Sequence, residues 1–381
     1  MKQVYHVADA MLCSLGKDSQ SVFEAVTAGQ SGIRSRSFDT GLTYPVSMLS
    51  AAQEQMLAAK YGPDYSRFEQ MCLFVAACAI EQSNIDAASE ACLFILSTTK
   101  GNVTQIGQEA VAESIPLHYS AKKIGQYFNN PNPVSVVSVA CISGVAAQIM
   151  AKRLLESDHY KYAIIIGCDE LSPFILAGFH SFQALSATPC RPFDANRSGL
   201  NLGEAAVCMV LSNEQAAASG EGILEGGAIS NDANHLSGPS KTGEELGVAI
   251  RQAMAEAGKS PEAIGFVSAH GTATNYNDEM EAKAIHHAGI KAPVNSLKPY
   301  FGHTLGASGL LETLISLKAM NAGLLLPTLH FETSNVSVPV SIIKEISHKE
   351  ISNFVKTAAG FGGCNAAVLW SKYNLQHDSE N

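Results

Sequence analysis

Short apolar runs that favour strands alternate with longer amphipathic stretches that favour helices along the 381 residues of the chain. The pattern predicts strands at residues 91–96, 134–140, 162–167, 205–211, 265–269 and 366–370. It predicts helices at residues 21–28, 68–82, 143–155, 243–257, 278–288 and 306–321. Strand and helix patterns that alternate in this way indicate an α/β fold.

No low-complexity linker divides the chain. The polar, small-residue stretch at 212–222 predicts a boundary between a longer first part, 1–212, and a shorter second part, 213–381. In both parts a turn of small residues opens a long apolar helix, at 141–144 and at 302–309. A structural duplication would account for this similarity, although no sequence repeat accompanies it.

The composition is that of a globular protein, because 46% of the residues are hydrophobic and only 16% are charged. Residues 1–16 lack the pattern of a secretory signal, and the chain has no apolar run of about eighteen residues. We therefore expect a cytoplasmic protein without a membrane span. The net charge of −10 and the lack of a long basic block argue against nucleic acid as a partner.

The nine cysteines form no C-x-x-C pair and mostly lie in apolar surroundings. This pattern argues against zinc ribbons and disulfide frameworks and favours a reducing compartment. We expect no metal site.

Cys141 follows the apolar run 134–140 and directly precedes the helix predicted at 143–155. The start of a helix presents unpaired N–H groups and partial positive charge, which favour a thiolate and can hold an oxyanion. The pattern is typical of a nucleophile, but a small buried cysteine would fit it equally well.

Two histidines and a lysine have comparable positions. His270 ends the apolar segment 264–269, while His303 lies before a helix and five residues after Lys298. A neutral imidazole at the start of a helix can donate a hydrogen bond to an oxyanion. Taken singly, each histidine is more often a structural or surface residue.

Seven short motifs along the chain together are specific enough to indicate a protein family. They comprise Ala-Cys-x-Ser-Gly at 140–144, Arg-Pro-Phe-Asp at 191–194, Gly-Glu-Ala at 203–205, His-Gly-Thr-x-Thr at 270–274, Asn-Asp-x-x-Glu at 277–281, Lys-x-x-x-Gly-His-Thr-Leu-Gly-Ala at 298–307 and Gly-Phe-Gly-Gly-x-Asn at 360–365. Over nearly its whole length the chain resembles the elongating β-ketoacyl synthases of the thiolase superfamily.

This resemblance implies a thiolase-like α/β fold of five layers, α-β-α-β-α, with two similar halves. It also implies a decarboxylative Claisen condensation between an acyl thioester held on Cys141 and malonyl-acyl carrier protein. His270 and His303 match the residues that assist loss of carbon dioxide and bind the enolate oxygen. The backbone N–H groups of Cys141 and Phe361 match the oxyanion hole of the acyl thioester.

Other positions match supporting roles. Lys298 matches the lysine that organises the site and pairs with a glutamate, here Glu312. Thr272 and Thr274 match residues that bind the phosphopantetheine arm, and Phe361 matches a gate to the acyl tunnel. The segments 191–194 and 277–281 are expected to support loops.

The chain also departs from the family pattern. Val139 replaces a threonine, and Ala358 and Ala359 stand where larger residues are common, which would widen the space near the gate. The run at 97–102 and the form of the motif at 203–206 resemble synthases of aryl polyene or related pigment pathways.

The resemblance implies an acyl carrier protein as partner, a homodimer or a heterodimer with a related subunit, and no required cofactor. The main alternative is a non-catalytic chain-length or acyl-binding subunit, although such subunits lack the nucleophile. An initiating synthase would have asparagine where His303 stands. A degradative thiolase would need a second catalytic cysteine, for which Cys364 is the C-terminal candidate.

Overall fold

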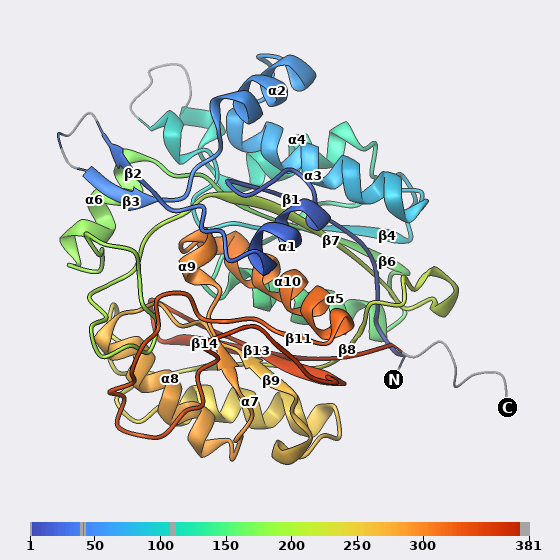
Figure 1. The fold of residues 1–381 in the computed structure, drawn as a ribbon. Coiled ribbons are helices and arrows are strands. Elements are labelled where there is room, and N and C mark those ends of the chain that lie inside the picture. Colours follow the sequence, from blue (N-terminus) through green and yellow to red (C-terminus); the bar gives the residue numbers. More distant parts are fainter. Residues whose placement is uncertain (1, 39–40, 42, 107–111, 374–381) are drawn as a thin grey trace, which may run out of the picture.

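A computed structural model describes residues 2–38, 41, 43–106 and 112–373. Its layers are seen from top to bottom in Figure 1 as helices, strands, central helices, strands and helices. The predicted α-β-α-β-α order is therefore present. Among the described residues, no helix is both long and apolar enough to cross a membrane.

The two strand layers share one topology. Among the described residues, the first layer has the order β5 (Ser135–Val137), β4 (Cys92–Ser97), β6 (Tyr162–Asp169), β7 (Ala205–Ser212) and β1 (Tyr5–Cys13). The second has the order β10 (Val294–Asn295), β9 (Phe266–Ser268), β13 (Asn353–Gly360), β14 (Cys364–Ser371) and β8 (Ile223–Asn231). When the five strands of each layer are numbered 1 to 5 in chain order, the spatial order in both layers is 3-2-4-5-1. The fold is therefore duplicated, although the sequence shows no repeat.

The two layers join where Tyr5 of β1 pairs with Ile223 of β8. Two short antiparallel strand pairs lie outside them: β2 (Arg34–Ser37) with β3 (Thr43–Val46), and β11 (Leu324–Leu325) with β12 (Ser347–His348).

Strand alternation explains the layers. In β7, Val207 and Met209 face the central core, while Cys208 and Val210 face the outer core of the first half. Successive side chains of a strand point to opposite faces, so a strand that is apolar at every position must be covered on both sides. β14 behaves in the same way between the central core and the outer core of the second half.

The helices divide among the three helical layers. The first outer layer holds α2 (Ala51–Tyr61), α3 (Arg67–Ser83) and α4 (Leu117–Tyr127), and the second holds α7 (Glu244–Glu256) and α8 (Asn275–His287). The centre holds α5 (Ser143–Glu156), α9 (Lys298–Phe301) and α10 (Ser308–Ala322), with α1 (Ser19–Thr27) nearby, and α6 (Pro173–Ser181) lies to one side. α10 is buried around its circumference, as a central helix must be.

Candidate active site

Cys141 lies in a tight turn between β5 and α5, and this turn corrects one expectation. The strand predicted at 134–140 ends at Val137, and Ala140 adopts φ +44°, in the left-handed region that is costly for residues with a Cβ atom. Ser143 stabilises the turn, because its Oγ accepts from Val139 N at 2.9 Å and donates to Ala140 O at 2.6 Å. The turn leaves Cys141 two residues before the helix.

A second turn packs against Cys141. A Cβ atom on Gly360 would lie 3.0 Å from Cys141 N and 2.8 Å from Cys364 Sγ. Only glycine allows the turn at 360–363 to approach Cys141 this closely.

The expectation of a thiolate at Cys141 is wrong. Burial raises the pKa of the Cys141 thiol to about 12, and the neighbouring Cys364 thiol adds to the rise. The charges of Lys298 and Lys100 oppose this rise without overcoming it. Removal from water disfavours the charged form more than these cations favour it, so the resting side chain is a thiol.

His270 follows β9 in a loop that two carboxylates of α8 hold in place. Glu281 accepts hydrogen bonds from His270 N and Gly271 N, both at 2.7 Å, and Asp278 accepts one from Thr272 N at 3.0 Å. Asp278 also accepts from Phe193 N at 2.7 Å, which connects the segment 191–194 to the same loop. Both segments expected to support loops therefore contact the loop that carries His270.

His303 lies between α9 and α10, directly after Gly302. Gly302 has φ +66°, and a Cβ atom there would come within 2.5 Å of Leu202 O, so the close approach of two loops requires glycine. The backbone N of His303 donates to Asn201 O at 2.7 Å. Among the described residues neither ring nitrogen has a hydrogen-bond partner, which leaves the imidazole free to bind a ligand.

Cys141 and both histidines meet at one cavity of about 290 Å³. The ring centroids of His270 and His303 are 5.2 Å apart at an interplanar angle of 85°. Six of the eight predicted site residues line this cavity: Cys141, His270, Thr272, Thr274, His303 and Phe361. The hydroxyl oxygens of Thr272 and Thr274 are 2.9 Å apart.

The other two, Lys298 and Glu312, lie outside the cavity lining and form a buried ion pair. Ser308 Oγ donates to the same carboxylate at 2.8 Å. Lys356, which sequence reasoning missed, lies 2.7 Å from Glu312 through its Nζ. Burial alone would raise the pKa of Glu312, but the two ammonium groups lower it to about 2.

The same charges act on the histidines. Burial is the main cause that lowers the pKa of His303 to about 3, and the positive charge of Lys298 adds to it. Burial and the charge of Lys298 also hold the pKa of His270 well below its usual range. Both imidazoles are therefore neutral at physiological pH, with one N–H donor each.

Phe361 lies in an aromatic cluster at the cavity rather than in the core. Its ring stacks on Phe179 with centroids 5.7 Å apart and meets the edge of Phe182 at 5.3 Å. Of the two alanines expected to widen this space, Ala359 lines the cavity, but Ala358 points into the central core. Only the first can widen the cavity, because neighbouring strand residues face opposite sides.

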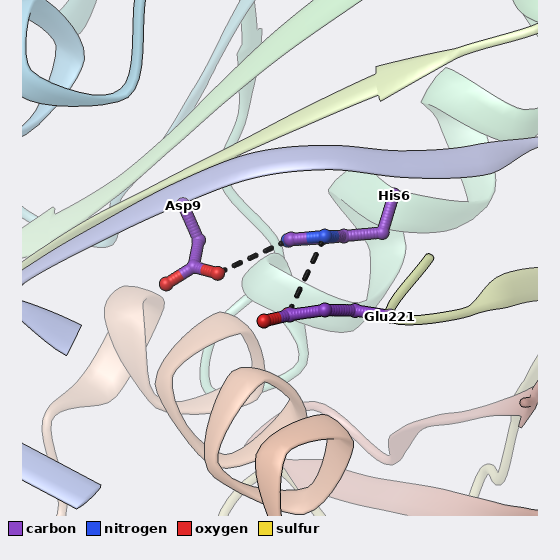
Figure 2. Close-up of side chains that lie close together, drawn as sticks. All are labelled: His6, Asp9 and Glu221. Carbon is purple, nitrogen blue, oxygen red and sulfur yellow. Dashed lines mark ion pairs between the residues drawn. The ribbon is translucent and has the colours of Figure 1, made fainter. Parts of the chain in front are cut away.

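A second group of titratable side chains lies away from this cavity (Figure 2). His6 Nε2 is 3.3 Å from Asp9 Oδ2, and His6 Nδ1 is 3.5 Å from Glu221 Oε2. Lys318 Nζ lies 3.3 Å from each of these carboxylates. Its ammonium supplies positive charge to both carboxylates, so we interpret the group as an ion-pair network.

Comparison with known proteins decides the family. The N-terminal domain model of β-ketoacyl synthases matches residues 1–217, and the C-terminal domain model matches residues 222–332. The chain belongs to the β-ketoacyl synthase family. It is therefore a condensing enzyme of the acyltransferase type.

Among curated proteins, the chain is 28% identical to 3-oxoacyl-[acyl-carrier-protein] synthase 2 of Vibrio cholerae, over 95% of this chain and 97% of that protein. It is 30% identical to a putative polyketide β-ketoacyl synthase of Streptomyces halstedii, over 65% and 63%. The relatives of this synthase thus include a 3-oxoacyl-[acyl-carrier-protein] synthase and a putative polyketide β-ketoacyl synthase.

Solved ketosynthases share its fold. The ishigamide ketosynthase/chain length factor superposes with a TM-score of 0.90 at 23% identity, over 98% of this chain and all of that one. A ketosynthase in complex with its chain length factor from Xenorhabdus doucetiae superposes with a TM-score of 0.84 at 27% identity, over 97% and 98%. The predicted thiolase-like fold is confirmed.

Proposed function

We propose that this synthase condenses an acyl group held on Cys141 with a malonyl unit delivered by an acyl carrier protein. The observation that carries the proposal is the meeting of Cys141, His270 and His303 at one cavity, with the glycine turn at 360–363 against the nucleophile.

In the first half-reaction, Cys141 Sγ attacks the carbonyl carbon of an acyl thioester. The bond to the carrier sulfur breaks, and the proton of the Cys141 thiol ends on the departing carrier thiol. The N–H groups of Cys141 and Phe361 would hold the oxyanion, since both belong to the two turns that pack together there.

In the second half-reaction, the malonyl thioester loses carbon dioxide and becomes an enolate. Its oxygen would accept hydrogen bonds from the neutral imidazoles of His270 and His303. The enolate carbon then attacks the acyl carbonyl, the bond to Cys141 Sγ breaks, and the thiolate takes up a proton. This donor pair stabilises charge that exists only along the reaction path.

The remaining roles follow from position. Thr272 and Thr274 would bind the phosphopantetheine arm at the cavity wall, and Phe361 would gate the acyl side by leaving its contacts with Phe179 and Phe182. Lys298 and Glu312 would hold the histidines in position from outside the cavity lining. No metal or redox cofactor enters these steps.

We further propose that the synthase forms a dimer, either with itself or with a chain length subunit. The structural similarity to ketosynthases that have chain length factors supports the second form. The segments at 97–102 and 203–206 support a role in an aryl polyene pathway, and the composition supports a cytoplasmic location.

Intact-mass measurement after incubation with acyl-carrier thioesters tests the proposal. We expect one acyl adduct on the wild-type protein, its loss in Cys141→Ala, and its persistence in Cys78→Ala, a control cysteine that is partly exposed. Added malonyl-carrier should convert the adduct to a β-ketoacyl product. Condensation by Cys141→Ala at the wild-type rate would refute the proposal. An adduct without condensation, even with a partner subunit present, would favour the acyl-binding alternative.

A further inference from the structure

Lys356 brings a charged group into the protein interior without reaching the cavity. Its side chain is fully buried, and it lies in β13, where its backbone pairs with Ser268 of β9. Its Nζ has four oxygen neighbours: Thr357 O at 2.8 Å, Ser268 O at 3.1 Å, Ala269 O at 3.1 Å and Glu312 Oε2 at 2.7 Å.

These neighbours belong to the segments that hold His270 and His303 in place. Ser268 and Ala269 are the two residues directly before His270. Glu312 is the carboxylate that pairs with Lys298, and Lys298 begins the short helix that leads to His303. Burial of an ammonium group costs several kcal/mol unless its partners compensate, so an apolar residue would be the cheaper way to fill this space.

We propose that Lys356 is a positioning residue for the condensation, whose ammonium group ties the strand end that carries His270 to the carboxylate that holds Lys298. The inference rests on the proposed roles of His270 and His303. Lys356 itself would touch neither substrate nor the reacting atoms.

The charge of Lys356 also acts on the imidazoles. The groups that face them are Lys298 from α9, Lys356 from β13, Glu312 from α10, Glu281 from α8 and the Cys141 thiol. Burial and the charge of Lys298 are the main causes of the low pKa of both histidines, and the charge of Lys356 adds to them, for His270 after the effect of His303. An imidazolium would pair with the malonyl carboxylate and oppose its loss as carbon dioxide, so the enzyme benefits from neutral imidazoles.

Lys356→Met tests the inference, because it keeps much of the side-chain volume and removes the charge. We expect acylation of Cys141 to stay within about threefold of wild type, while the kcat for condensation falls about tenfold to a hundredfold. The pH at which kcat falls on the acid side should rise, because the histidines lose a repelling cation. Lys318→Met is the matched control: it also removes a largely buried, ion-paired lysine, but away from the cavity, and should leave kcat and its pH profile unchanged.

Chemical rescue gives a second measurement. Lys356→Ala leaves a space with four oxygen atoms facing it, which ethylammonium can enter and bind through its N–H groups. We expect ethylammonium chloride, but not tetramethylammonium chloride, to restore part of kcat. Should Lys356→Met fail to fold, Lys356→Arg keeps the charge and should keep the acid side of the pH profile in place.

A wild-type kcat and pH profile in folded Lys356→Met would overturn the inference. A loss of kcat without a shift of the profile and without rescue by ethylammonium would also overturn it, since any structural residue could cause such a loss. Failure of the proposed function itself would look different: the wild-type protein would then fail to acquire the acyl adduct on Cys141 or to decarboxylate malonyl-carrier.

Discussion

Glu312 is the carboxylate between two buried lysines, and Glu312→Gln removes its charge while keeping its shape. The pKa of Glu312 falls from an ordinary 4.5 to about 2 in the folded protein. At about 1.4 kcal/mol per pKa unit, this fall corresponds to about 3 kcal/mol of stability at pH 7. A similar loss, about 3 to 5 kcal/mol, is typical when one partner of a buried ion pair is removed.

The sign of the pH dependence follows from the lowered pKa. The contribution of Glu312 is complete above its unfolded pKa, near 4.5, and is lost as the pH falls toward 2. The difference in unfolding free energy between wild type and Glu312→Gln should therefore shrink from about 3 kcal/mol at pH 7 to about 1.4 kcal/mol at pH 3.

Urea denaturation of both proteins at pH 7 and pH 3 measures this difference. Glu332→Gln is the control, because Glu332 is 67% exposed in its ion pair with Arg191 and should change stability by less than about 0.5 kcal/mol. A destabilisation by Glu312→Gln that is equal at both pH values would refute the electrostatic explanation. So would a destabilisation no larger than that of Glu332→Gln.

Three further predictions concern the cavity and the second ion-pair network. Gly360→Ala should reduce acylation of Cys141 at least tenfold in the mass assay, because the added Cβ atom would press on Cys141 N. Gly178→Ala is the control: its Cβ atom would have no atom within 4 Å, and Cys141 should be acylated normally in this variant. Phe361→Ala should lower condensation about tenfold yet change the melting temperature little, since the ring is 36% exposed; an equal loss of folded protein would contradict a role at the gate. Zinc ions or EDTA should leave the melting temperature unchanged, because Lys318 already pairs with both Asp9 and Glu221. Stabilisation by zinc would show that a metal displaces the lysine.

The sequence predicted those strands whose residues are apolar at every position. β6 and β7 were found almost to the residue, because both their faces are covered. β1 and β13 were not predicted, because His6 and Asp9 interrupt the apolar pattern of β1 and Lys356 interrupts that of β13. Polar groups of this kind are tolerated only because partners distant in the sequence pair with them, and such partners cannot be read from local periodicity.

The site was predictable where chemistry is tied to a motif. Cys141, His270 and His303 stand in recognisable segments, but Lys356 stands in none; its one signal is a lone charge within a run of apolar and small residues. The ionisation of Cys141 could not be predicted, because a helix start favours the thiolate while burial opposes it. The balance between these effects depends on how deeply the complete fold buries the thiol.

The duplicated fold divides the residues that line the cavity between its halves. Cys141 comes from the first half, whereas both histidines and the turn at 360–363 come from the second. During synthesis, the cysteine leaves the ribosome well before the residues that would act with it. A chain that stopped after β7 would expose a thiol that has neither donors nor cavity. Cys141 can therefore meet the two histidines at one cavity only when almost the whole polypeptide has been made and its two halves have docked.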